Sequence, residues 1–112
     1  MKWEAFVALG LELPEVEEST SYGRPALKVS GKFIAGWNPN ENAFVLRLAS
    51  VEEQQLLIEM APQLYYITDH YAGYPAVLIR PAKLTKSEAR GRLRNAWRLK
   101  APSRLRKQFD AD

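Results

Sequence analysis

Cysteine is absent from this 112-residue chain, and histidine occurs once, at His70. The absence of cysteine excludes disulfides, thiolate zinc sites and cysteine nucleophiles, and a single histidine excludes a metal site built from several imidazoles. A chain without cysteine fits a reducing compartment, so we expect a cytoplasmic protein. Long apolar runs are also missing, both the roughly 18 residues of a membrane-spanning helix and the shorter run of a secretory signal. We therefore expect neither a membrane anchor nor export.

Sequence motifs of common catalytic sites are missing as well. Residues 31–36 have the glycine spacing of a phosphate-binding loop, but Trp37 and Asn38 stand where that loop needs Lys and Ser or Thr. No Gly-x-Ser-x-Gly elbow presents a serine as a nucleophile. We expect a protein that is not an enzyme and that needs no cofactor or metal.

The residues that are present indicate one globular domain covering residues 1–112, which we expect to be monomeric. Hydrophobic residues make up 46% of the chain and charged residues 26%, a composition typical of a folded soluble protein. The charges are segregated, because five glutamates and one lysine occur up to Glu18, whereas ten Lys or Arg residues and the single acid Glu88 occur from Lys83 to Lys107. Such a basic segment attracts polyanions by simple electrostatics.

Hydrophobic periodicity and helix-capping signals predict three helices and about five strands. Ser50 and Thr85 are each followed three residues later by a glutamate, which is the capping box of a helix start. The predicted helices are Lys2–Leu11, Val51–Met60 and Lys86–Lys100. The predicted strands are Ala26–Val29, Lys32–Trp37, Ala43–Leu48, Tyr65–Ile67 and Ala76–Ile79, with a further strand or turn between Glu17 and Arg24.

These elements predict an α+β fold in which helices pack on one face of an antiparallel sheet. The Ser30-Gly31 pair is a two-residue connector typical of a β-hairpin. The segment after Pro102 is polar enough to be a frayed tail. The expected core comprises Phe6, Val7, Phe33, Phe44, Leu46, Leu57, Val77, Ile79, Leu93 and Trp97.

The last predicted helix carries a ladder of basic side chains. A spacing of about 100° per residue places Ala89, Leu93, Ala96 and Trp97 on one apolar stripe that packs on the sheet. On an adjacent face, Lys86, Arg90, Arg94 and Arg98 follow one another at intervals of one turn. Like charges at this spacing repel by a few tenths of a kcal/mol per pair unless an anion offsets them.

Two explanations of this ladder remain open. In the first, the ladder binds the phosphates of nucleic acid, and Lys28 and Lys32 of the hairpin contribute. In the second, the ladder is structural, and acids such as Asp69 or Glu41 form ion pairs with it.

Two further groups of polar residues have a structural and a functional interpretation. Tyr22, Arg24, Lys32 and His70 combine aromatic, cationic and titratable groups, which suit base stacking and phosphate contact or structural hydrogen bonds. Glu12, Glu15, Glu17 and Glu18 form either a solvated acidic edge or a set of oxygen ligands for a hard cation, although their spacing matches no calcium loop.

The run from Leu13 to Val29, continued by Gly31-Lys32-Phe33, resembles the signature of the MmcQ/YjbR family, and the later elements follow in the same order. The resemblance implies a fold similar to the CyaY/frataxin-like fold, and a DNA-binding role in which β-hairpin wings contact DNA; it implies no catalytic site. The chain departs from the family pattern at Leu27, where the family usually has Phe, and in the heavier arginine content of its last helix.

We therefore expect a DNA-binding protein that holds nucleic acid weakly, mainly through phosphates. A protein-interaction module of unknown partner is the alternative. A frataxin-like metal-binding protein is a third possibility, but apolar residues occupy much of the first helix and leave Glu4 and Glu12 as its acids.

Overall fold

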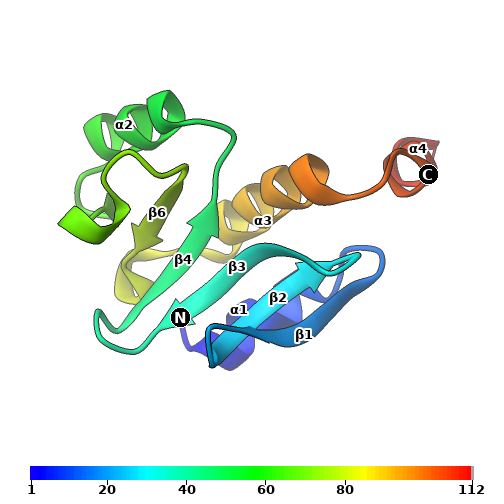
Figure 1. The fold of residues 1–112 in the computed structure, drawn as a ribbon, viewed down its shortest axis with the longest axis horizontal. Helices are drawn as coiled ribbons and strands as arrows, with labels where there is room; N and C mark the ends of the chain where they lie inside the picture. Colours follow the sequence, from blue (N-terminus) through cyan, green and yellow to red (C-terminus); the bar gives the residue numbers. More distant parts are fainter. Residues whose placement is uncertain (112) are drawn as a thin grey trace.

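A six-stranded antiparallel sheet forms the centre of the computed structural model, which describes residues 1–111 (Figure 1). The strand order is β1-β2-β3-β4-β6-β5, and every neighbouring pair is antiparallel. The strands are β1 (Val16–Ser21), β2 (Arg24–Val29), β3 (Lys32–Asn38), β4 (Ala43–Arg47), β5 (Tyr65–Tyr66) and β6 (Ala76–Ile79). The helices are α1 (Trp3–Gly10), α2 (Val51–Met60), α3 (Lys86–Lys100) and α4 (Ser103–Ala111), with short 3-10 helices η1 (Asp69–Tyr71) and η2 (Pro81–Lys83).

Two tight turns build the β1–β2–β3 part of the sheet. Ser30 and Gly31 have φ values of 51° and 76°, and Tyr22 and Gly23 have φ values of 52° and 76°. Positive φ at both central residues is the type I′ geometry, whose twist matches that of the flanking strands. The predicted hairpin at Ser30-Gly31 is confirmed. The segment that the sequence predicted as a further strand or turn forms β1, which adds a sixth strand to the five predicted ones.

The capping signals set the starts of α2 and α3 at the residues predicted from the sequence. The Ser50 hydroxyl accepts a hydrogen bond of 3.1 Å from the Glu53 backbone N–H, and the Thr85 hydroxyl accepts one of 3.2 Å from the Glu88 backbone N–H. Each bond satisfies one of the backbone donors that a helix start leaves free. The first helix, α1, is one residue shorter at each end than the predicted Lys2–Leu11.

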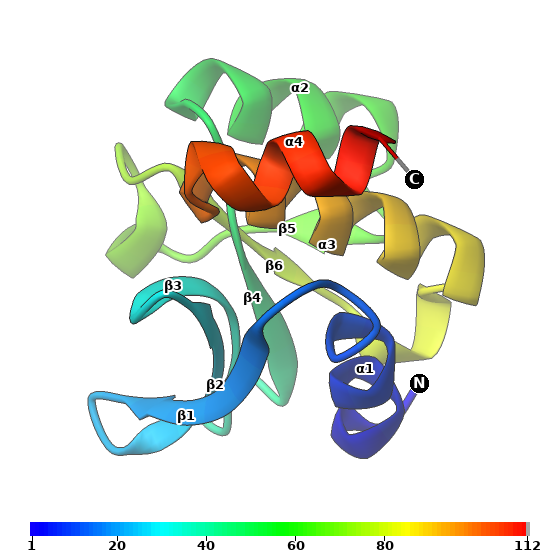
Figure 2. The ribbon, with the colours of Figure 1, turned by 90° about the vertical axis from the view of Figure 1, so that its right-hand side faces the viewer.

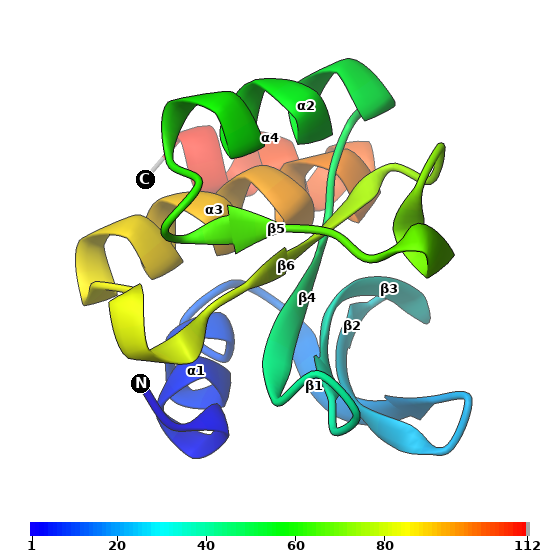
Figure 3. The same cartoon turned by 90° about the vertical axis from the view of Figure 1, so that its left-hand side faces the viewer.

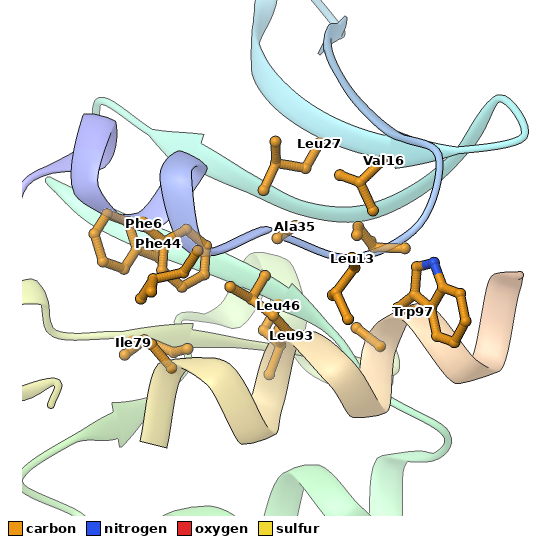
Figure 4. Packing of buried hydrophobic residues seen from close by; sticks show 14 of the residues in the cluster. Phe6, Leu13, Val16, Leu27, Ala35, Phe44, Leu46, Ile79, Leu93 and Trp97 are labelled. Carbon is orange, nitrogen blue, oxygen red and sulfur yellow. The ribbon is translucent and has the colours of Figure 1, made fainter. Parts of the chain in front are cut away.

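Helices α1 and α3 cover the same face of the sheet, and α2 packs against β5 and β6 (Figures 2 and 3). One cluster joins Phe6 of α1, Leu57 of α2 and Leu93 of α3 to the sheet. Figure 4 shows Phe6 and Leu93 within this cluster. The ring of Phe6 stacks on that of Phe44 with 4.3 Å between the centroids. The predicted α+β class and nine of the ten predicted core residues are confirmed.

Phe33 is the exception, because it is only half-buried. The register between β2 and β3 shifts between Leu27 and Lys28, so that Ile34 and Ala35 are both fully buried under the helices. The irregularity places Phe33 opposite Lys28, on the other face of the sheet. The alternation of side chains between the two faces of the sheet is therefore interrupted in β3 at Ile34 and Ala35.

The predicted frayed tail after Pro102 is wrong, because this segment forms α4. Leu105 is 2% exposed, and the ring of Phe109 lies 5.0 Å from that of Trp97. The spacing of four residues puts both apolar side chains on one face of α4. The high proportion of polar residues around them conceals this short amphipathic pattern.

Candidate nucleic-acid interface

The apolar stripe of α3 fixes how the basic side chains are presented. Ala89, Leu93, Ala96 and Trp97 are buried, as the helical spacing predicts. The indole N–H of Trp97 also donates a hydrogen bond of 3.0 Å to the carbonyl of Pro14, in the loop between α1 and β1. This bond and the stripe set the rotation of α3 about its axis, so the ladder of Lys86, Arg90, Arg94 and Arg98 lies beside the packed face.

Acids pair with two of the four cations in this ladder. Arg90 donates two hydrogen bonds, of 3.1 and 3.2 Å, to the carboxylate of Glu12. Arg98 donates two, of 3.3 and 2.5 Å, to the carboxylate of Asp110 on α4. The ladder therefore has acid partners, but they are not Asp69 and Glu41, the acids that the sequence suggested.

The other two cations of the ladder keep their charge uncompensated at short range. Within residues 1–111, neither Lys86 nor Arg94 has a carboxylate within 4.0 Å, and both side chains are exposed. The guanidinium of Arg94 lies 5.9 Å from the ring centroid of Phe109, which positions it without neutralising it.

The two acids of the ladder remain ionised at neutral pH. The hydrogen bond from Arg90 lowers the pKa of Glu12, and the hydrogen bond from Arg98 lowers the pKa of Asp110. The ladder and its two carboxylates consequently carry two net positive charges. Both ion pairs are exposed to solvent, and such pairs contribute little to folding stability. A phosphate oxygen can therefore replace either carboxylate at small cost.

Only one of the two hairpin lysines lies on the side of the ladder. Lys28 pairs across the sheet with Glu17, while its neighbours Leu27 and Val29 are buried under the helices. Because side chains alternate along a strand, Lys28 lies on the face opposite α3. Lys32 pairs with Val29, so it lies on the helix-covered side, at the β2–β3 turn. A ligand seated on the ladder does not reach Lys28.

The second group of candidate residues does not form one site. Tyr22 is fully exposed at the β1–β2 turn, and Arg24 is the first residue of β2. Lys32 lies opposite Val29, the last residue of β2, and at the usual rise per residue it is therefore about 16 Å from Arg24 along the strand. His70 lies on η1, where its ring meets that of Tyr71 edge-on at 5.2 Å. Arg24 and Lys32 therefore lie at opposite ends of β2, and the four residues do not form one combined site.

The acidic edge is likewise divided. Glu12 is held by α3, and Glu15 forms an ion pair of 3.3 Å with Arg104 of α4. Glu17 and Glu18 are consecutive residues of β1 and lie on opposite faces of the sheet. Across the described part of the chain, no three acidic or histidine side chains come together as metal ligands.

None of the helices in the described part of the chain is long and apolar enough to cross a membrane.

A partly buried network on the other side of α3 was not predicted from the sequence. The Tyr65 hydroxyl donates a hydrogen bond to the Glu88 carboxylate, and Arg92 donates to both groups, at 2.9 and 3.1 Å. Burial raises the pKa of Tyr65 to about 12, and the hydrogen bond from Tyr65 lowers the pKa of Glu88. The Glu88–Arg92 spacing of four residues was the available signal. This network holds Arg92 away from the exposed ladder.

Fold and surface together define a small α+β domain with one antiparallel sheet and a basic helix. The YjbR family profile matches residues 11–99, and the chain belongs to this family, the MmcQ/YjbR family. It is 33% identical over 79 residues to the uncharacterized proteins Mb2600 of Mycobacterium bovis and Rv2570 of Mycobacterium tuberculosis. That match covers 70% of this chain and 61% of each relative. No solved structure matches, so the likeness to the CyaY/frataxin fold remains a prediction.

Proposed function

We propose that this protein binds nucleic acid, DNA in particular, weakly and with little sequence selectivity, through phosphate contacts made by the α3 ladder. The observation that carries the proposal is the pair of exposed cations, Lys86 and Arg94, that have no acid partner among residues 1–111, within a ladder of net positive charge. No catalytic step belongs to the proposal.

The ladder has a measurable electrostatic signature. Lys86 and Arg94 contact phosphates directly, and a third contact arises when a phosphate displaces the carboxylate from Arg90 or Arg98. Three neutralised phosphates on a duplex give a slope of about −2.7 for log affinity against log salt concentration. Affinity then falls roughly 40-fold between 50 and 200 mM salt.

The test compares two double variants that remove the same charges from opposite faces of the sheet. Lys86→Gln with Arg94→Gln alters the ladder, and Lys28→Gln with Arg24→Gln is the matched control. Fluorescence anisotropy with a labelled 16-base-pair duplex should show a slope flattened by about 1.8 in the first variant. The control should keep the parental slope. Equal weakening by both variants, or no binding by the parent at low salt, would overturn the proposal.

A gain-of-function variant tests the competition between carboxylate and phosphate. Glu12→Gln removes the acid that holds Arg90 and frees its guanidinium for a phosphate. The duplex should bind more tightly at 50 mM salt, and the salt slope should steepen by up to about 0.9. Unchanged affinity in this variant would show that Arg90 makes no phosphate contact.

One observation favours the alternative of a protein-interaction module. Leu56 and Met60, one turn apart on α2, are 53% and 68% exposed, and together they form an apolar strip on the side away from the core. Such a strip binds another protein by burying apolar area, and this kind of binding depends little on salt. The salt slope measured above therefore distinguishes the two functions.

A further inference from the structure

An open recess of about 790 Å³ is lined in part by Met1 to Glu4. The N-terminus lies on the side of the molecule away from α4 (Figure 1). The start of α1, the end of β3, the β3–β4 turn and the residues from Arg80 onward line it. Three of its lining side chains are aromatic: Trp3, Trp37 and Tyr66. This volume lies within the range of about 300–1,000 Å³ that small-ligand sites occupy.

The two tryptophans give the recess flat apolar walls. Their ring centroids are 6.4 Å apart with 42° between the planes, and both rings pack on Phe44, at 6.0 and 5.8 Å. Each remains only partly buried. Neither indole N–H donates to an acceptor within residues 1–111, whereas the buried Trp97 donates to Pro14. The recess is thus lined by two tryptophan rings whose indole N–H groups have no acceptor among residues 1–111.

A cation and an acceptor stand at the rim of the recess. The guanidinium of Arg80 lies 4.1 Å from the ring centroid of Tyr66 and has no carboxylate within 4.0 Å in the described chain. The Tyr66 hydroxyl donates a hydrogen bond of 3.1 Å to Glu41, whose carboxylate keeps further acceptor sites. Aromatic faces, an unpaired arginine and a carboxylate suit a planar ring that has amino donors and a neighbouring anion.

We propose that this recess binds one unstacked nucleobase of a single-stranded nucleic acid, with the base against Trp37 and Trp3 and an adjoining phosphate on Arg80. The inference rests on the proposed function and extends it to a preference for single strands. Bases stack on aromatic side chains irrespective of sequence, while a duplex keeps its bases inside the stack. The short η2 segment leads from Arg80 to α3, so the recess adjoins the end of the ladder that begins at Lys86.

Two variants of the full chain test the recess, with a matched control. Trp37→Leu removes the stacking surface, and Arg80→Gln removes the rim cation. Arg47→Gln is the control, because Arg47 also lies over a tyrosine ring, that of Tyr74 at 5.3 Å, but outside the recess. Circular dichroism melting verifies that each variant is folded. Anisotropy then compares a labelled ten-nucleotide mixed-sequence single strand with the duplex of the same sequence.

The wild-type protein should bind the single strand about tenfold more tightly than the duplex at 50 mM salt. Trp37→Leu should abolish this preference without weakening the duplex, and Arg80→Gln should flatten the single-strand salt slope by about 0.7. Arg47→Gln should change neither. If Trp37→Leu does not fold, the salt slope of Arg80→Gln decides. Equal affinity of the wild type for both ligands, or an unchanged slope in Arg80→Gln, would overturn the proposal of a base-binding recess, while duplex binding would still support the proposed role of the ladder. Absence of binding to either ligand by the wild type would overturn both proposals.

Discussion

Gln54 is a buried amide that fastens a loop to α2, and replacing it should destabilise the whole domain. Its side chain is 1% exposed. Its amide nitrogen lies 3.1, 2.8 and 2.7 Å from the backbone carbonyls of Tyr71, Tyr74 and Ala76. Two amide hydrogens thus serve three carbonyls that have little access to water. Gln54→Met keeps the length of the side chain and removes the donors.

The expected loss can be worked from these bonds. Two net hydrogen bonds contribute about 1 kcal/mol each. The carbonyls of Tyr71 and Tyr74 keep backbone donors, the N–H groups of Tyr74 and Ala76, so the added desolvation cost, of similar size, concerns the Ala76 carbonyl. We expect Gln54→Met to lower the free energy of unfolding by about 3 kcal/mol and the melting temperature by roughly 10–15 °C. Urea denaturation followed by circular dichroism measures this, with the exposed neighbour Gln55→Met as the control. A loss below about 0.5 kcal/mol would refute the reasoning.

Gln54→Glu adds a pH dependence of known sign. A carboxylate facing three carbonyls is disfavoured when charged, so the folded-state pKa of this carboxyl is raised above its unfolded value of about 4.3. The protonated form can still donate one hydrogen bond. The stability deficit of this variant should therefore be smallest below pH 4.3 and should grow as the pH rises through the raised pKa. Equal deficits at pH 4 and pH 8 would contradict this assignment.

Three further predictions concern the phenol network, two glycines and α4. Because the pKa of Tyr65 is about 12 in the folded protein, against an ordinary value of 10.0, the stability due to its protonated phenol should be complete below pH 10 and lost between pH 10 and 12. Phenolate absorbance should show this late titration, and Tyr65→Phe should remove it. Gly91→Ala should stabilise the protein by about 0.5–1 kcal/mol, because the added methyl carbon in α3 has no atom near it. Gly36→Ala should destabilise the protein, because its added carbon would lie 2.9 Å from the Phe33 ring. Thermal melts measure both effects. Leu105→Ala should cost about 2–4 kcal/mol in urea denaturation, and a cost below about 1 kcal/mol would show that α4 does not dock.

The helices and most strands could be predicted because their signals are local. The hydroxyls of Ser50 and Thr85 act within three residues of their own position, so both N-caps could be predicted from the sequence. The glutamates do not close the reciprocal half of either capping box, because Glu53 accepts from the Ala49 N–H and Glu88 accepts from Tyr65 and Arg92. The apolar stripe that ends at Trp97 needs only the helical period to be recognised. In contrast, α4 has just two apolar anchors, Leu105 and Phe109, and it folds because Trp97 offers them a surface.

The face of the sheet on which Phe33 lies could not be predicted from the alternation of apolar and polar residues along β3. Whether two strands keep their register depends on both partners, and the irregularity between β2 and β3 lets Ile34 and Ala35 share one face. A pattern read along β3 alone contains no information about that shift. The same limit applies to the grouping of Arg24 with Lys32, which are close in sequence but lie at opposite ends of β2.

The acid partners of the ladder were also invisible in the sequence, for a reason that bears on function. Glu12 is 78 residues from Arg90, and only the packing of α1 beside α3 brings them together. Asp110 reaches Arg98 because α4 folds back over the end of α3. Repulsion within the ladder is therefore relieved at its second and fourth positions and left in place at Lys86 and Arg94.

Helix α4 accordingly does more than cover Trp97. Its Phe109 lies under the guanidinium groups of Arg94 and Arg98, at 5.9 and 5.3 Å, and its Asp110 neutralises one of them. A phosphate that replaces Asp110 on Arg98 takes away a charge contact of α4 but leaves its apolar anchors buried. Because those anchors supply most of the docking energy of α4, the helix stays in place while its acidic end is exchanged for the ligand. In the proposed binding mode, the number of phosphates that the ladder can bind therefore depends on how easily Glu12 and Asp110 are displaced, and not on the four basic side chains alone.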